Sequence, residues 1–189
     1  MLVCIPKNVV VPNYSMQKNL NINEILGDVR FFDTNEKADE NNYLPISVCV
    51  SIRSTYSNLV VAHKIDKIER YYTTITNIPN PLPFKGDELL AYLTSLAVTQ
   101  AYSPTNPIVQ KLMVTSALLP IGVYHMNMNM KVAYPYFYSQ VIINDEYLDL
   151  MRDNLNDGYY LVPISEMNTN GNLKKITDEL IIIKEKSNA

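Results

Sequence analysis

The stretch GDELLAYLTSLAVTQA, residues 86–101, decides how the rest of the chain is interpreted. Its apolar side chains recur at the spacing of one helical face, which predicts an α-helix with a single apolar stripe against a core. The residues that recur at this spacing are Leu89, Leu90, Leu93, Leu96, Ala97 and Gln100. Two acids, Asp87 and Glu88, stand in the first turn, where negative charge is favoured by the helix dipole.

The residues before this helix predict three strands and a rigid loop. Residues 46–52 (ISVCVSI) alternate apolar with small polar side chains, as in a half-buried strand. Residues 58–62 (NLVVA) are expected to be its hairpin partner, and residues 71–78 (YYTTITNI) are rich in the aromatic and β-branched residues that favour strands. Three prolines in residues 79–83 exclude both helix and strand there.

The residues after the helix predict further strands and short helices. We expect a second helix at 107–118, a strand pair at 121–126 and 132–143, a short helix at 145–155, a strand at 159–162, a helical turn at 163–167 and a strand at 177–186. The first 43 residues are sparser in apolar side chains. In them we expect strands at 2–5, 9–11 and 29–32, a polar helix at 21–26 and an exposed connection at 34–42.

This pattern predicts a mixed α/β or α+β fold, with an N-terminal arm at residues 1–43 and a single domain at residues 44–189. The chain has 189 residues, of which 47% are hydrophobic and 19% are charged, so it can form a packed core. A net charge of −3 argues against nucleic acid or an anionic membrane as the partner. Cys4 and Cys49 are too few for a disulfide framework and are expected to be reduced and structural.

The order of these predicted elements resembles that of a Nudix domain over about residues 44–167. In the Nudix family a hairpin and an aromatic strand precede a glycine loop and a helix, and a strand pair follows. The corresponding pieces here are residues 46–52, 59–62, 71–78, the helix from Gly86, and Ile121-Gly122-Val123-Tyr124 leading into residues 132–143. The resemblance implies a mixed sheet flanked by helices, with Glu166 in a turn near its end.

The resemblance also implies a catalytic site that this sequence does not match. The Nudix signature, G-x5-E-x7-R-E-x-x-E-E-x-G, places carboxylates on the helix to hold metal ions. After Gly86 the helix has neither an Arg-Glu nor a Glu-Glu pair, and residues 77–81 (NIPNP) stand where the family has Gly-Gly. The resemblance therefore implies a degenerate scaffold, with no enzyme activity, no catalytic residue, no metal and no cofactor.

The other residues that could be catalytic or metal-binding are better explained by structural or solvent-exposed positions. No sequence motif of a catalytic Ser or Cys nucleophile accompanies His63 or His125. Residues 64–70 form a mixed-charge segment that we interpret as a solvated loop, with a partner contact as the alternative. Four acids, Asp145, Glu146, Asp149 and Asp153, begin a helix and are expected to form an exposed acidic face.

Aromatic and methionine side chains gather in residues 124–138 (YHMNMNMKVAYPYFY), a composition enriched in interface cores. An ordinary strand pair with Pro135 at an edge is the alternative. We predict an interface formed by this stretch and by the apolar residues of the arm. The predicted interface residues are Leu2, Val3, Ile5, Val9, Val11, Tyr124, Met126, Met128, Tyr134, Tyr136 and Tyr138.

The sequence alone favours a non-enzymatic structural or assembly protein. Its skew toward residues with A/T-rich codons favours a low-GC bacterium or its phage, so we expect a virion component such as a connector, ring or tail protein. Its partners would be copies of itself and neighbouring virion proteins, in the virion or the host cytoplasm. Two alternatives stay open: a divergent Nudix-type nucleotide hydrolase with unrecognised acids, and a small adaptor or inhibitor of a host protein.

Overall fold

The computed structural model describes most of the chain. The described residues are 1–9, 16–17, 22–64, 70–103, 105–107, 110, 117–125 and 135–167. The chain forms two compact units, of which the first comprises Met1–Cys49, Thr74–Leu96 and Pro120–Ser139, and the second comprises Val50–Thr73, Ala97–Leu119 and Gln140–Ala189. No helix among the described residues has the length and apolar character needed to cross a membrane. The predicted helix at 107–118 and the predicted strand at 177–186 lie mostly or wholly outside the described residues.

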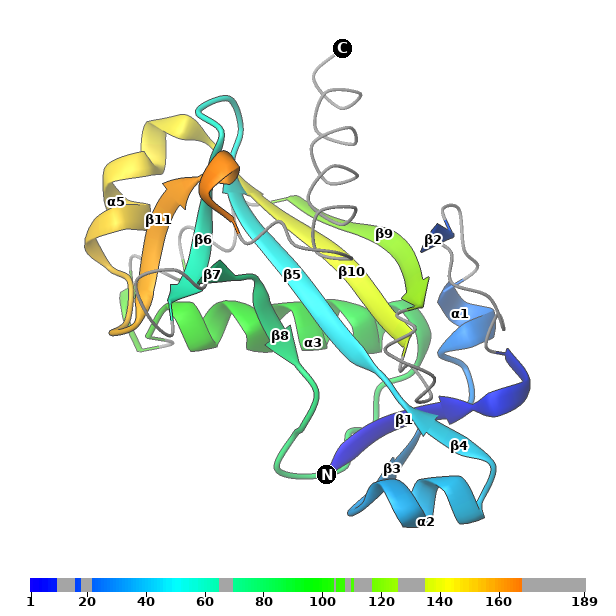
Figure 1. Cartoon of the computed structure of the whole chain (residues 1–189). Helices are drawn as coiled ribbons and strands as arrows, with labels where there is room; N and C mark the ends of the chain where they lie inside the picture. Colours follow the sequence, from blue (N-terminus) through cyan, green and yellow to red (C-terminus); the bar gives the residue numbers. More distant parts are fainter. Residues whose placement is uncertain are drawn as a thin grey trace. The chain divides into compact units, whose positions relative to one another are not determined.

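A three-stranded antiparallel sheet lies in the first unit and is covered by a short helix (Figure 1). Its strand order is β3-β1-β4, with β1 at Leu2–Pro6, β3 at Arg30–Phe32 and β4 at Tyr43–Pro45. Helix α2 (Asn35–Glu40) connects β3 to β4 and packs its one buried residue, Ala38, in a cluster with Cys4 and Tyr43. Residues 1–43, predicted as an arm, thus contribute two of the three strands of this sheet.

The second sheet has eight strands among the described residues. Its order is β11-β6-β5-β10-β9-β2, with β7 paired to β6 and β8 paired to β5. The strands are β2 (Met16–Gln17), β5 (Ser47–Ser54), β6 (Leu59–Lys64), β7 (Arg70–Tyr71), β8 (Thr73–Ile75), β9 (Ala117–His125), β10 (Pro135–Ile143) and β11 (Tyr159–Pro163). The fold class predicted from the sequence, mixed α and β with sheets flanked by helices, is confirmed.

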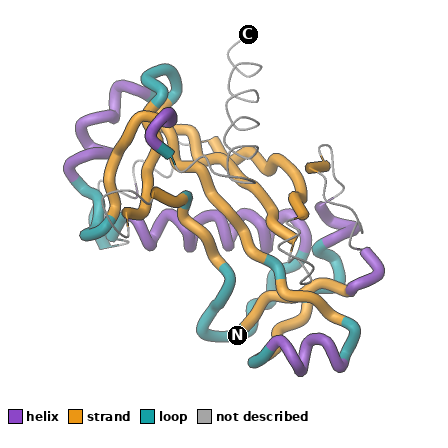
Figure 2. Tube along the Cα trace, viewed as in Figure 1, coloured by secondary structure: helices purple, strands orange, loops and turns teal. Residues whose placement is uncertain are grey.

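Besides α2, the described residues form further helices and short helical turns, which Figure 2 shows among the strands and loops. The longest is α3, and the others are α1 (Ile22–Ile25), α5 (Leu148–Asp153) and the 3-10 turns η1 (Lys7–Val9), η2 (Asp145–Tyr147) and η3 (Ile164–Glu166). Helix α3 spans Gly86–Ala101, as its apolar stripe predicts. In the second unit, β11 pairs antiparallel with β6 from Tyr159↔His63 to Pro163↔Leu59.

Strand β5 differs from the prediction, because it is buried on both faces. All eight of its residues are buried, including the small polar side chains that the alternation placed toward solvent. Ser47 shows how these polar groups are accommodated, since its hydroxyl lies 2.9 Å from that of Thr76. Alternation of small polar and apolar residues therefore marks a central strand here, in which each polar atom needs a partner inside the protein.

The connection predicted at residues 34–42 is exposed apart from Ala38, but it contains helix α2, which the sequence pattern did not predict. The hydroxyl of Thr34 accepts a hydrogen bond from the backbone N–H of Lys37 at 3.2 Å, which is the geometry of a helix N-cap. The carboxylate of Asp33 lies 3.2 Å from the ammonium of Lys37, one helical turn on. A local cap and one buried side chain are enough to form a helix that has no apolar stripe.

Candidate functional site

The first turn of α3 is the candidate site, because the Nudix resemblance places the catalytic helix here. The turn begins at Gly86, whose φ of 58° lies in the left-handed region. The backbone N–H of Gly86 donates to the carbonyl oxygen of Leu26 at 3.0 Å. A Cβ at this position would come within 2.2 Å of the side-chain oxygen of Asn23, so only glycine fits without a shift.

Asn23, on helix α1, holds the next residue of α3 with two hydrogen bonds. Its side-chain oxygen accepts from the backbone N–H of Asp87 at 3.0 Å, and its amide donates to the carboxylate of Asp87 at 2.9 Å. Asn23 therefore acts as an N-cap that is supplied from a distant part of the sequence. Glu88 follows on the exposed side of the same turn.

Beyond this turn, α3 turns an apolar face toward the core. Leu89 and Leu93 are at most 1% exposed, as predicted, whereas Leu96 is only half-buried and Gln100, at the end of the predicted stripe, is exposed. The only polar side chain that is buried on this helix is Thr94, and its hydroxyl donates to the carbonyl oxygen of Leu90 at 2.7 Å. The buried part of α3 therefore offers no carboxylate.

The proline loop before α3 is fixed to the start of the chain. The backbone N–H of Ile78 donates to the carbonyl oxygen of Met1 at 2.9 Å, and Leu2 pairs with Asn77. Figure 1 shows the N-terminus beside this loop. At the other end of the loop, the ring centroid of Phe84 lies 4.9 Å from that of Tyr92, which is exposed on α3.

The residues that the structure describes do not fit the metal ions of a Nudix site. A divalent ion such as Mg²⁺ or Mn²⁺ needs several oxygen ligands at one place. Among the described residues no three His, Cys, Asp or Glu side chains gather closely enough to hold an ion. The two acids of α3 stand at its exposed start, and one of them, Asp87, already bonds to Asn23.

The cysteines and one histidine occupy structural positions. Burial raises the pKa of both Cys4 and Cys49 to about 12, so neither is a thiolate at neutral pH. The ring of His63 stacks on that of Tyr159, with 4.8 Å between the ring centroids. His125 is the last residue of β9.

Of the four acids predicted to form an exposed face, Glu146, Asp149 and Asp153 are exposed and Asp145 is half-buried. The carboxylate of Asp145 accepts hydrogen bonds from the backbone N–H of Tyr56, at 3.0 Å, and from the hydroxyl of Ser57. Asp149 lies 3.2 Å from Arg152 in an exposed ion pair. In the mixed-charge segment, the ammonium of Lys64 lies 4.8 Å from the ring centroid of Tyr160, while residues 65–69 lie outside the described part.

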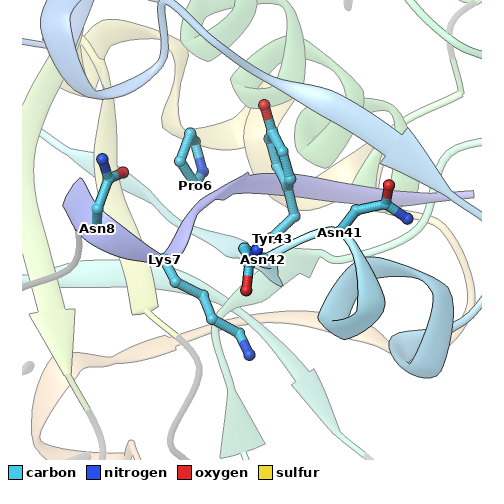
Figure 3. Close-up of a pocket in the computed structure, with 6 residues that line it drawn as sticks. All are labelled: Pro6, Lys7, Asn8, Asn41, Asn42 and Tyr43. Carbon is cyan, nitrogen blue, oxygen red and sulfur yellow. The ribbon is translucent and has the colours of Figure 1, made fainter.

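An open hollow of about 530 Å³ lies beside the three-stranded sheet (Figure 3). Its lining residues are Pro6, Lys7, Asn8, Asn41, Asn42 and Tyr43. They do not converge, because Lys7 and Asn42 point to one side while the ring of Tyr43 points to the other. Lys7 pairs with Asp39, and the hydroxyl of Tyr43 donates to Asp28 at 2.9 Å. The polar groups of this hollow therefore serve the fold.

Arg53 is a buried cation that sequence reasoning passed over. It is 1% exposed in the middle of the second unit's core, and burial lowers the pKa of its guanidinium. Tyr72 is an electrostatic neighbour that opposes this shift. The only charged residue in a strand of apolar and small polar side chains, residues 47–54, was the signal available in the sequence.

The predicted interface residues fall in different parts of the structure. Val3 and Ile5 are each 1% exposed within the first unit, and Leu2 and Val9 are half-buried. Tyr124 belongs to β9, and Tyr136 and Tyr138 belong to β10. Val11, Met126, Met128 and Tyr134 lie outside the described residues. Contact between any of them and another subunit stays a prediction.

The architecture defines a class of protein: this chain has a Nudix-like fold. Among solved structures it is similar to the crystal structure of Tm1382, described as "a putative Nudix hydrolase", with a TM-score of 0.57 and 8% identity over 93% of this chain and 88% of that one. It is also similar to the Escherichia coli dihydroneopterin triphosphate pyrophosphohydrolase, with a TM-score of 0.41 and 8% identity over 64% of this chain and 81% of that one. No family model matches the sequence, and no curated protein matches it.

The similarity to Tm1382 corrects the expectation that the chain is not an enzyme. That expectation rested on the missing signature acids of α3. The fold shared along 93% of the chain is that of a structure described as "a putative Nudix hydrolase", and at 8% identity this similarity shows the fold alone. The absence of one motif shows only that this helix lacks those acids, and it does not show that the fold has lost its activity.

Proposed function

We propose that this chain is a divergent Nudix-type hydrolase that cleaves a nucleoside diphosphate-linked substrate. The observation that carries the proposal is the fold shared with Tm1382 over nearly the whole of both chains, at a TM-score of 0.57. A fold hosts many functions, so the proposal rests on analogy at the level of the fold. It names no acid of α3 as catalytic, because that helix does not reproduce the family's arrangement.

The proposed reaction is hydrolysis of a phosphoanhydride bond. A water oxygen forms a new bond to one phosphorus, and the bond from that phosphorus to the bridging oxygen breaks. The bridging oxygen leaves with the electron pair on the second phosphate, and the protons of the attacking water pass to solvent or to the product phosphates. The reaction needs no oxidant or reductant, so water and the substrate balance it.

A substrate screen tests the proposal. The purified full chain would be incubated with nucleoside triphosphates, dinucleoside polyphosphates, nucleotide sugars and ADP-ribose, each with Mg²⁺ or Mn²⁺, and the products followed by ³¹P NMR. We expect turnover of at least one of these substrates above the rate without protein. If well-folded protein turned over none of these substrates, the result would contradict the proposal.

A matched variant separates true turnover from a contaminating hydrolase. Leu93 is 1% exposed and lies away from the acids of α3, so Leu93→Ala lowers the stability of this chain and leaves a contaminant untouched. Activity that belongs to this chain must therefore be lost at a lower temperature in the variant. The expected contacts with other protein subunits, in a virion or in the host cytoplasm, stay separate predictions.

A further inference from the structure

We draw no further inference here: the strongest candidate, the row of half-buried aromatic side chains that Tyr159, His63 and Tyr71 form across strands β11, β6 and β7 of the second unit, is an unpartnered sheet face, and nothing in the described part of the chain shows what covers it.

Discussion

Helices α3 and α2 begin in opposite ways. Helix α3 is capped by Asn23, a residue 64 positions before the Asp87 that it holds. Helix α2 is capped by Thr34, which is three positions before its partner Lys37. The first helix therefore depends on the tertiary structure for its start, whereas the second carries its start signal in its own local sequence.

The two helices also differ in what keeps them folded. Helix α3 buries a continuous face over sixteen residues, while the six residues of α2 bury only Ala38. Burial of apolar area dominates the stability of a helix in a protein, and caps and ion pairs add smaller terms. The comparison teaches that Asp87, at the start of α3, can be explained by its hydrogen bonds to Asn23, without a catalytic role.

The largest effect is expected from the buried face of α3. Leu93→Ala removes a side chain that is 1% exposed and leaves a cavity, so the free energy of unfolding should fall by about 2–5 kcal/mol. Urea unfolding followed by circular dichroism measures this change. A loss below about 1 kcal/mol, in the range of a surface substitution, would show that the α3 face is not a core element.

A smaller loss is expected at the distant cap. Gly86→Ala forces an L-residue to φ 58° and places its Cβ within 2.2 Å of the Asn23 side chain, so we expect a loss of about 1–3 kcal/mol. The double variant with Asn23→Ala should lose less than the sum of the two single losses, because the clash is gone. Strict additivity would contradict the contact between these residues.

The local cap of α2 should matter less. Thr34→Ala removes the oxygen that accepts from the N–H of Lys37 at 3.2 Å, and the expected loss is about 1 kcal/mol. Thr34→Ser keeps this oxygen and serves as the control. Equal losses for the two variants would mean that the methyl group of Thr34, rather than its hydroxyl, stabilises the helix.

The smallest effect belongs to the ion pair at the start of α2. Asp33 and Lys37 lie 3.2 Å apart and both are exposed, so Asp33→Asn should change the free energy of unfolding by no more than about 0.5 kcal/mol. The change should shrink further in 1 M salt, where such pairs are screened. A loss larger than that of Thr34→Ala would reverse the ranking of cap and ion pair.

Sequence reasoning found the elements whose patterns are regular and long. The stripe of α3 and the order of strands around it were enough to predict the mixed fold and its resemblance to the Nudix domain. It missed α2, because a six-residue helix with one buried side chain has no period to detect. It also took β5 for a half-buried strand, because small polar residues such as Ser47 can face either solvent or a partner inside the protein.

The candidate site was harder to predict than the fold. Asn23 could not be recognised as the cap of α3, since 64 residues separate it from Asp87 and only the tertiary structure brings the two together. The missing signature acids concern one helix alone, so they do not decide whether the fold has an activity. Fold and site follow from different residues, so evidence on one does not decide the other.

The most direct test of the account is the temperature at which hydrolysis stops in the wild type and in Leu93→Ala. If this chain is the hydrolase, the temperature of inactivation should fall in the variant together with its melting temperature, by on the order of 10 °C. Measuring both on the same preparations, with the substrate that the screen gives, compares the two values directly. An inactivation temperature that stays the same while the melting temperature falls would show that the activity comes from another protein.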